Sequence, residues 1–335
     1  MKLSRVVLPF VILVLLVESA GCVQSSPQTS DQQSASTARA KPRKTYADLI
    51  VGFAQLGAES DWRTANTKSI KETADRLGIE LRFSDAQQKQ ENQITAIRSL
   101  IVQKVDVIGI SPIVETGWKT VFQEARNAGI PIILVDRRAD VPDEFYATYL
   151  GSDFLEEGRN AARTLATIVD GKANIVELMG TIGSAPANDR YFGFRQILKD
   201  YPDMHIIDSQ SGDFTRAKGK EVMQAFLKTH GKDITALYSH NDDMTLGAIQ
   251  AIQDYGLKPG VDIKIVSVDA ERAAFEAMIA GQLNATVECN PLLGPQFFDL
   301  ALKVVNGETV PKWVPSQESI FLPGNAKDIL QMRQY

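Results

Sequence analysis

Polar and charged side chains gather directly after most of the short apolar runs of this chain. In the first half these groups are Gln55–Arg63, Asp85–Gln88, Ser111-Pro112 and Asp136-Arg137-Arg138; in the second half they are Asn188-Asp189-Arg190, Gln210–Phe214, His240–Asp243, Asp269-Ala270-Glu271 and Glu288-Cys289-Asn290. Asp and Glu accept hydrogen bonds, Arg donates them and Asn does both, a combination that suits the hydroxyl groups of a neutral polyol. Trp62 and Phe214, one in each half, could stack on the apolar face of a ring.

Metal binding and catalysis are less well supported by the residues. His240, Asp242 and Asp243 lie together at a strand-to-helix turn, where such groups more often cap the helix, so we expect no metal site. Two cysteines cannot build a thiolate-rich zinc site. The chain also lacks G-x-S-x-G, H-E-x-x-H and the P-loop lysine motif. We therefore expect no cofactor, no catalytic residue and no enzyme.

The elements that must position these polar groups follow from the hydrophobic pattern. It predicts nine strands, at Leu49–Phe53, Leu81–Ser84, Val107–Ile110, Ile132–Val135, Ala173–Glu177, His205–Ser209, Ala236–Tyr238, Ile263–Val268 and Ala285–Glu288. Helices are predicted between them, near residues 62–77, 92–103, 116–128, 153–169, 188–200, 215–229, 243–255, 271–280 and 294–305. This alternation is typical of parallel sheets built from right-handed βαβ units. Ligands of such open sheets bind beyond the carboxyl ends of the strands, where the polar groups of this chain fall.

Nine strands are many for one sheet, so the pattern favours two similar halves. The division falls after residue 150, where Gly151-Ser152-Asp153 restarts the alternation. Asp153 should cap the helix that follows it. Ser60 or Asp61 precedes the first long helix, Asn241 and Asp242 precede the helix at 243–255, and Thr116 should open another helix. Taken singly, each polar residue at a strand end could be only a cap or half of a structural ion pair. Their joint placement in both halves is what favours a binding site.

The first 22 residues have the pattern of an export signal. Lys2 and Arg5 precede an apolar run, Val6–Val17, which is followed by Ser19-Ala20-Gly21 and then Cys22. The run is about half of the roughly 20 apolar residues that a spanning helix needs. Cysteine after Ala-Gly resembles a bacterial lipoprotein signal, which implies a signal peptide over residues 1–21 and a lipid on Cys22. The alternative is an uncleaved anchor, and either way the chain would work outside the cytoplasm, tied to a membrane.

Composition narrows the class of protein further. Residues 22–45 hold almost no large apolar side chains and are predicted to form a flexible tether. The 335-residue chain is 44% hydrophobic and 23% charged, which is enough for two ordinary globular domains. A net charge of −5 without a long basic run argues against a nucleic-acid partner. If Cys22 carries a lipid, Cys289 has no partner, which excludes a disulfide framework.

Three segments carry a specific resemblance. They are Val135-Asp136-Arg137, Gln210–Gly219 (QSGDFTRAKG) and His240–Ile249 (HNDDMTLGAI). On these segments residues 48–330 resemble the periplasmic sugar-binding proteins of the ribose/galactose-binding type. Within that group, Gly57–Arg63 (GAESDWR) and Asp85–Gln93 (DAQQKQENQ) are most similar to galactofuranose-binding proteins of ABC importers.

The resemblance implies an α/β fold of two Rossmann-like parallel-sheet lobes joined by a three-strand hinge, the type I periplasmic binding protein fold. The N-terminal lobe would comprise residues 46–150 and 291–318, and the C-terminal lobe residues 151–290 and 319–335. It also implies a set of sugar contacts, with Arg63 and Gln87 as additions: Glu59, Trp62, Arg63, Gln87, Asp136, Arg137, Phe214, Asn241 and Asp269.

Two positions depart from the pattern of the ribose binders. Those proteins have an arginine where this chain has Asn188, so Arg190 is expected to substitute for it. They have a glutamine where this chain has Cys289, so Glu288 or Asn290 is expected to take over. These departures favour a hexose, with a furanose first, over ribose.

The resulting expectation is a monomeric, lipid-anchored binding protein that delivers a monosaccharide to an ABC permease. The alternative is a sensor that presents the bound sugar to a receptor kinase or chemoreceptor, because the sequence of the binder would look the same. A transcriptional repressor is rejected, since an export signal and no helix-turn-helix segment precedes the first strand.

Overall fold

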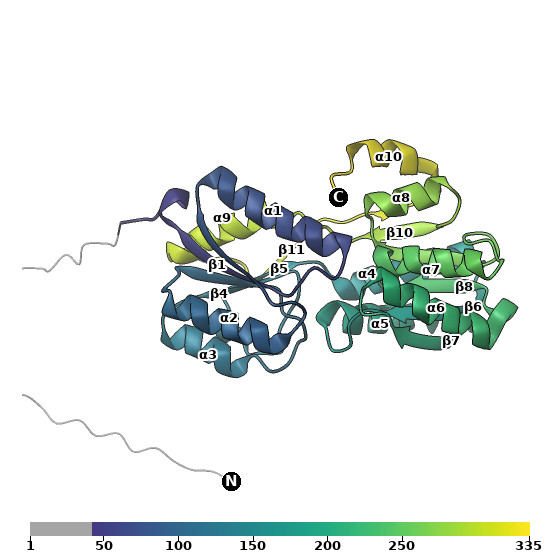
Figure 1. Cartoon of the computed structure of the whole chain (residues 1–335), viewed down its shortest axis with the longest axis horizontal. Coiled ribbons are helices and arrows are strands. Elements are labelled where there is room, and N and C mark those ends of the chain that lie inside the picture. Colours follow the sequence, from purple (N-terminus) through teal and green to yellow (C-terminus); the bar gives the residue numbers. More distant parts are fainter. Residues whose placement is uncertain (1–41) are drawn as a thin grey trace, which may run out of the picture. The chain divides into compact units, whose positions relative to one another are not determined.

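Two six-stranded sheets organise the chain in the computed structural model, which describes residues 42–335 (Figure 1). The predicted signal peptide, the predicted lipidation at Cys22 and most of the predicted tether lie outside the described residues. We call each sheet, together with the helices packed on it, a lobe. Among the described residues, no helix is both long enough and apolar enough to cross a bilayer.

The sheet of the first lobe is parallel throughout and has the strand order β11-β5-β4-β3-β1-β2. Its strands are β1 (Ile50–Gln55), β2 (Glu80–Asp85), β3 (Val107–Ile110), β4 (Ile132–Val135), β5 (Thr148–Gly151) and β11 (Trp313–Pro315). Helices α1 (Asp61–Leu77) and α9 (Gly294–Val305) cover one face, and α2 (Gln90–Val102) and α3 (Lys119–Asn127) cover the other (Figure 1). Because both faces are covered, β3 and β4 are apolar and buried along their whole length.

The sheet of the second lobe has the order β12-β10-β9-β8-β6-β7, and only β12 runs antiparallel to its neighbour. Its strands are β6 (Lys172–Met179), β7 (Asp203–Ser211), β8 (Ala236–Ser239), β9 (Lys264–Asp269), β10 (Ala285–Glu288) and β12 (Ile320–Phe321). Helices α4 (Phe154–Ile168) and α5 (Ala185–Leu198) cover one face. The other face carries α6 (Arg216–His230), α7 (Asp242–Asp254) and α8 (Arg272–Ile279), with α10 (Ala326–Met332) against α8.

All nine predicted strands and all nine predicted helices are present near their predicted positions. Asp153 caps α4 as predicted, and Ser60 and Asn241, which were expected to precede helices, cap α1 and α7, each accepting a hydrogen bond from a backbone amide of the first turn. The prediction for Thr116 is wrong, because α3 begins at Lys119. Strands β5, β11 and β12 and helix α10 were not predicted. Residues 42–335 also contain four 3-10 helices, at Tyr46–Asp48, Asp143–Phe145, Gly231–Asp233 and Pro323–Asn325.

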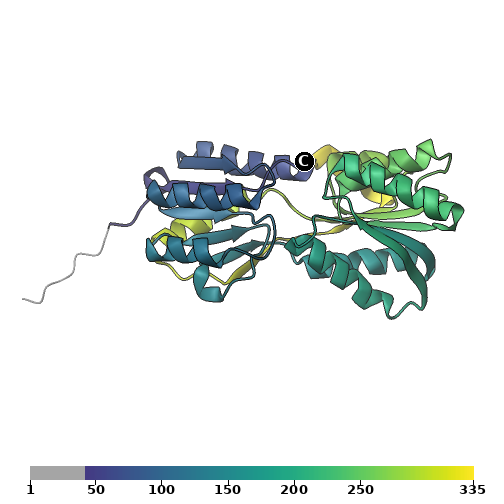
Figure 2. The ribbon, with the colours of Figure 1, turned by 60° about the horizontal axis from the view of Figure 1, so that its bottom comes forward.

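The chain crosses between the two lobes three times, as the predicted hinge requires. It leaves β5 through Ser152-Asp153 to reach α4, leaves β10 through residues 289–293 to reach α9, and passes from β11 to β12 through residues 316–319. Figure 2 shows these connecting segments between the two groups of helices. The predicted lobe boundaries after residues 150, 290 and 318 fall at or next to these crossings, and their positions stay predictions.

Candidate functional site

One pocket lies where the carboxyl ends of strands from both sheets face each other. It holds about 280 Å³ of space free of protein atoms, including space open to solvent. Nine of the predicted site residues line this pocket: Glu59, Trp62, Arg63, Asp136, Arg137, Arg190, Phe214, Asn241 and Asp269. The lining is completed by Ser60, Phe154, Pro186 and Cys289. The prediction that polar groups from both halves would meet is confirmed by this geometry.

Arg63 organises the side of the pocket that belongs to the first lobe. It projects from the first turn of α1 and is 2% exposed. Its Nε donates to Glu59 Oε1 at 3.3 Å, its Nη1 donates to Ser111 Oγ at 3.1 Å, and its Nη2 donates to Asp136. Burial opposes the charged guanidinium, but the carboxylates of Asp136 and Glu59 more than offset it and raise the pKa of Arg63. Arg63 therefore stays charged and holds both acids in place.

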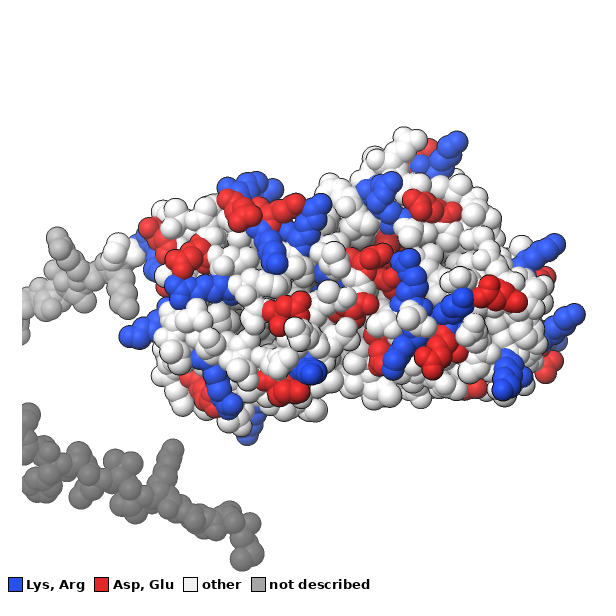
Figure 3. All heavy atoms as spheres, viewed as in Figure 1, with Lys and Arg blue, Asp and Glu red and all other residues white. Residues whose placement is uncertain are grey.

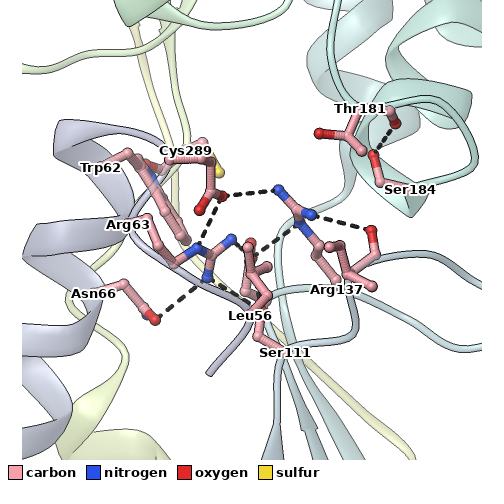
Figure 4. Close-up of polar contacts among 12 residues, drawn as sticks. Leu56, Trp62, Arg63, Asn66, Ser111, Arg137, Thr181, Ser184 and Cys289 are labelled. Atoms are coloured by element: carbon pink, nitrogen blue, oxygen red, sulfur yellow. Dashed lines mark hydrogen bonds and ion pairs between the residues drawn. The ribbon is translucent and has the colours of Figure 1, made fainter. Parts of the chain in front are cut away.

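Arg137 reaches the same carboxylate from the loop after β4. Its Nη2 donates to Glu59 Oε1 at 3.2 Å and its Nη1 donates to the carbonyl of Ile113 at 3.3 Å. Figure 4 shows Arg63 and Arg137 pointing toward each other with this carboxylate between them. Burial, followed by the nearby charge of Arg63, lowers the pKa of Arg137 to about 10, so it remains a cation at neutral pH.

Two buried atoms of this group have no hydrogen-bond partner. They are Oε2 of Glu59 and Nε of Arg137, one acceptor and one donor. Buried polar atoms in native proteins are nearly always paired, so each such exception requires an explanation. Both residues line the pocket, and a ligand hydroxyl can both donate to the acceptor and accept from the donor.

Arg190 plays the corresponding part in the second lobe. Its Nε donates to Glu157 Oε2 at 2.7 Å, its Nη1 donates to the carbonyl of His240 at 2.6 Å, and its Nη2 lies 3.7 Å from Asp269 Oδ1. Burial opposes its charge, but Glu157 and its other acidic neighbours raise the pKa of Arg190 well above its ordinary value. Burial is also the main reason why the pKa of Asp269 is raised.

Aromatic side chains form the apolar part of the lining. The predicted pair, Trp62 and Phe214, is joined by Phe154, which sequence reasoning missed. Trp62 Nε1 donates to the carbonyl of Cys289 at 2.6 Å, which fixes the ring against the crossing between β10 and α9 (Figure 4). Phe214 packs so closely over Gly180 that a Cβ there would lie 1.9 Å from its Cζ. Glycine is therefore required at position 180 for Phe214 to reach the pocket.

Unusual backbone conformations occur at several of these residues. Asp136 has φ of 64° at the end of β4, Asp269 has φ of 122° at the end of β9, and Phe214 has φ of 62°. Such values cost non-glycine residues roughly 1–3 kcal/mol and cluster at ligand sites. Asn241 is constrained differently, because its Oδ1 caps α7 and its Nδ2 donates to the carbonyl of Phe214 at 3.1 Å.

The charges that line the pocket balance. Counted at their formal charges, three acidic side chains, on Glu59, Asp136 and Asp269, face three guanidinium groups, on Arg63, Arg137 and Arg190. Outside the pocket, acidic and basic side chains are interspersed over the face of the molecule in Figure 3. A pocket with no net charge suits an uncharged polar ligand better than an anion or a cation, because no unpaired ion has to be buried.

Three predicted contact residues do not line the pocket. Gln87 is exposed on the turn after β2, where its φ is 53°. Asn188 Nδ2 instead donates to Glu115 Oε2 of the first lobe, at 2.7 Å. Glu288 points away toward the C-terminus and pairs with Arg333 at 2.7 Å. Glu288 or Asn290 was expected to take over from the glutamine that the ribose binders have at the position of Cys289. Instead, Cys289 itself lines the pocket.

Two lining residues, Phe154 and Pro186, were not predicted, because nothing in the sequence marks them as part of a site. Phe154 follows a helix cap and Pro186 lies in the first turn of α5, where apolar residues and proline are ordinary.

His240, Asp242 and Asp243, considered as one group in the sequence, have separate partners. His240 Nε2 lies 3.2 Å from a carboxylate oxygen of Glu177, whereas Asp242 accepts from a backbone amide near the start of α8 at 2.8 Å.

Residues 51–309 match the family described as periplasmic binding protein domain. The chain belongs to this family, whose fold of two mostly parallel sheets it shares. It is accordingly a solute-binding protein rather than an enzyme, and it works outside the cytoplasm.

Several relatives are similar over most of the chain. The galactofuranose-binding protein YtfQ of Escherichia coli K12 is 46% identical over 293 residues, which cover 86% of this chain and 92% of that protein. A crystal structure from Mycobacterium smegmatis in complex with β-D-fucofuranose is 52% identical, with a TM-score of 0.84 and coverage of 86% and 95%. The periplasmic binding protein of the arabinose ABC transporter of Shewanella sp. ANA-3, bound to α- and β-L-arabinofuranose, is 48% identical, with a TM-score of 0.83 and coverage of 85% and 95%.

Proposed function

We propose that this protein is the substrate-binding component of a sugar ABC transporter and that it binds one monosaccharide, in the furanose form, between its two lobes. The lobes would close around the sugar, and the permease would recognise the closed form. The residues proposed to contact the sugar are the lining residues other than Ser60 and Pro186: Glu59, Trp62, Arg63, Asp136, Arg137, Phe154, Arg190, Phe214, Asn241, Asp269 and Cys289.

The observation that carries this proposal is the unpaired donor and acceptor in the pocket. Arg137 Nε and Glu59 Oε2 are both buried, and neither has a hydrogen-bond partner within residues 42–335, although Arg137 Nε lies 3.8 Å from Asp136 Oδ2. A neutral polyol supplies both kinds of partner without adding charge to a lining that is already balanced. The three aromatic rings supply the apolar area that hydroxyl recognition does not.

The furanose form is supported by the ligands named for the similar proteins. Galactofuranose, fucofuranose and arabinofuranose differ in carbon number and stereochemistry but share the five-membered ring. We infer that the ring, more than any one hydroxyl, is what this pocket selects, with a hexose such as galactofuranose as the first candidate.

Anchoring is a further part of the proposal. The Ala-Gly-Cys pattern at residues 20–22 supports a lipid on Cys22, which would keep a monomeric binder close to its permease. A tether over residues 22–45 would let the two lobes move freely above the membrane.

The test is calorimetric titration of the purified protein with reducing sugars that equilibrate between ring forms: D-galactose, L-arabinose, D-fucose, D-fructose and D-ribose. The bound sugar is then identified by its anomeric carbon resonance after labelling with ¹³C at C1. We expect at least one sugar to bind, to raise the melting temperature, and to show a furanose resonance. Binding of none of these sugars would refute sugar transport, and a bound pyranose would refute selection by ring size.

A further inference from the structure

Three carboxylates converge outside the pocket, at the contact between the lobes. Asp61 opens α1 in the first lobe, Asp243 lies in the first turn of α7 in the second lobe, and Glu271 directly precedes α8. One oxygen atom from each lies within 4.8 Å of the other two. None of the three lines the sugar pocket, although Asp61 is adjacent to Trp62 and Glu271 follows Asp269 by two residues.

Glu271 makes this cluster different from an ordinary acidic patch. It is 3% exposed, and neither of its carboxylate oxygens has a hydrogen-bond partner among the described residues. The amide of Trp62 lies nearby without forming a bond of normal geometry. The charged groups around Glu271 are themselves acidic: Asp243, Asp242 and Asp61. Burial, followed by these acidic neighbours, raises the pKa of Glu271 well above its ordinary value. A buried carboxylate without a donor or a cation costs several kcal/mol, so this side chain either holds a proton or gains a positive partner.

The nearest arginine does not meet that need. Arg216 donates from Nε and Nη2 to Asp243 Oδ1 at 3.1 and 2.9 Å, and from Nη2 to Asp61 Oδ2 at 3.1 Å. No salt bridge from Arg216 to Glu271 is present among the described residues. Asp242 is also fully buried and accepts only neutral donors. One guanidinium therefore faces four carboxylates and reaches two of them. Of the two that it does not reach, only Glu271 also lacks a hydrogen-bond donor among the described residues.

We propose that Asp61, Asp243 and Glu271 bind a divalent cation across the contact between the lobes, and that Ca²⁺ is the ion this arrangement fits. The available ligands are all carboxylate oxygens, which hard cations prefer. Ca²⁺ takes oxygens at 2.3–2.6 Å, so two ligands on opposite sides of it lie up to about 5 Å apart. Mg²⁺ takes oxygens at about 2.0–2.1 Å in near-ideal octahedral geometry and usually keeps several of its waters, so a site built from three protein carboxylates suits it less well.

The cation site is built only when the lobes are in contact. Asp61 belongs to the first lobe and the other two ligands to the second, and the backbone amide of Asp61 already donates to Asp243 Oδ2 at 2.7 Å. A bound cation would therefore stabilise the closed arrangement. If the proposed sugar-binding function holds, sugar and cation favour the same state, and each must raise the affinity for the other by the same factor.

The first experiment measures the cation alone, without sugar. The protein is titrated calorimetrically with CaCl₂, and in parallel with Tb³⁺, whose luminescence is sensitised by a nearby tryptophan; Trp62 is next to Asp61 in the chain. We expect saturable binding of one ion, and displacement of Tb³⁺ by Ca²⁺ at concentrations where Mg²⁺ has little effect. Absence of saturable Ca²⁺ binding overturns the proposal, and so does equal displacement of Tb³⁺ by Mg²⁺.

Variants then assign the ion to these residues. Glu271→Gln and Asp61→Asn should each weaken Ca²⁺ binding at least tenfold. Asp61 has an exposed side chain, so its variant should fold even if the change at the buried Glu271 disturbs the protein. The matched control is Asp254→Asn, which removes an exposed carboxylate from the far end of α7 and should leave Ca²⁺ binding unchanged. Unchanged binding in Asp61→Asn, or an equal loss in the control, would place the ion elsewhere and overturn the assignment.

The last measurement separates this proposal from the proposed function. Sugar affinity is determined with and without saturating Ca²⁺, and we expect it to rise fivefold or more, within the usual range of coupling between sites. If Ca²⁺ binds but no sugar does, the proposed function fails and the cation site stands. If both bind without affecting each other, the cation does not depend on lobe contact, and the cross-lobe site is overturned.

Discussion

Asp136 combines the three features that recur in this site: a positive φ, a buried side chain and a hydrogen bond to an arginine. It lies at the end of β4 with a positive φ, is 4% exposed, and accepts hydrogen bonds from Arg63 and, at 3.2 Å, from Ser111 Oγ. The positive φ and the buried charge of Asp136 each cost free energy. Hydrogen bonds from Arg63, which lines the pocket, and from Ser111 stabilise the charge. Such a carboxylate is held ready to accept a hydrogen bond from a ligand hydroxyl.

Replacing this charge should weaken sugar binding without changing the shape of the pocket. We expect Asp136→Asn to lower sugar affinity by about 10- to 150-fold, which corresponds to the roughly 1.5–3 kcal/mol of a hydrogen bond to a charged group. Titration calorimetry measures the loss, and thermal melting checks that the variant is folded. Asp200→Asn, at an exposed position, is the control. A change of less than twofold in Asp136→Asn would contradict the proposed contact.

At the scale of elements, the three crossings between the lobes are joined by one serine. Ser152 Oγ lies 3.4 Å from Cys289 Sγ and 3.1 Å from Ser316 Oγ, and it also donates to Glu318. Ser152 lies in the first crossing, Cys289 in the second, and both Ser316 and Glu318 in the third. Burial, and then the charge of Glu157, raise the pKa of Glu318 to about 8. The hinge thus contains a carboxyl group that is largely protonated at neutral pH.

This group predicts a pH dependence of stability. The ordinary pKa of the side chain is 4.5, so the folded protein binds this proton more tightly than the unfolded chain does. The resulting stabilisation is complete below about pH 4.5 and is lost as the pH rises through about 8. Between these values the free energy of unfolding should fall by up to about 1.4 kcal/mol per pH unit on account of Glu318.

Denaturant unfolding at pH 5, 6, 7 and 8 measures this slope. We expect Glu318→Gln to flatten it, because glutamine keeps the hydrogen-bonding capacity and cannot ionise. Glu72→Gln removes an exposed carboxylate and should leave the slope as it is in the parent protein. An identical slope in the parent and in Glu318→Gln would show that Glu318 is not the titrating group.

At the scale of the whole molecule, contacts between the lobes outside the pocket define a closed arrangement. Asn188 Nδ2 donates to Glu115 Oε2, the amide of Glu115 donates to the carbonyl of Gly183 at 2.9 Å, and Arg138 pairs with Asp189. Asn188 was predicted to contact the ligand directly. The structure instead gives it a role in holding the lobes together, through which it can influence affinity by shifting the population of the closed form.

We expect Asn188→Ala to lower sugar affinity by about two- to tenfold, the range for loss of one hydrogen bond of roughly 0.5–1.5 kcal/mol. Because the effect acts on closure, small-angle X-ray scattering should show that the variant needs more sugar than the parent protein to reach the same reduced radius of gyration. Asn127→Ala, at an exposed position on α3, is the control. Parent-like affinity and compaction in Asn188→Ala would remove this residue from the closing contacts.

Much of the fold could be predicted because its signals are local. The strands at Val107–Ile110 and Ile132–Val135 are short apolar runs bounded by helices, and their predicted bounds agree with the structure. Strands β11 and β12 are only three and two residues long, too short to show a period, whereas β5 is as long as β3 and β4. The pairing of β5, β11 and β12 depends on partners far along the chain, such as Trp313 beside Tyr149. The sequence of each strand alone does not contain that information.

The sequence by itself determined the class of fold, the two repeated halves and the chemical character of the pocket. These follow from periodicity and from which residue types stand at strand ends, such as Asp136 and Asp269. Only the tertiary structure decided which side chains face the pocket, because partners distant in the sequence set their direction. Asn188 turns to Glu115 and Glu288 to Arg333, while Cys289 lines the pocket. The tertiary structure also decided which residues of the first lobe contact residues of the second lobe. Asp61 and Asp243 are 182 residues apart, and no local pattern could show that they touch.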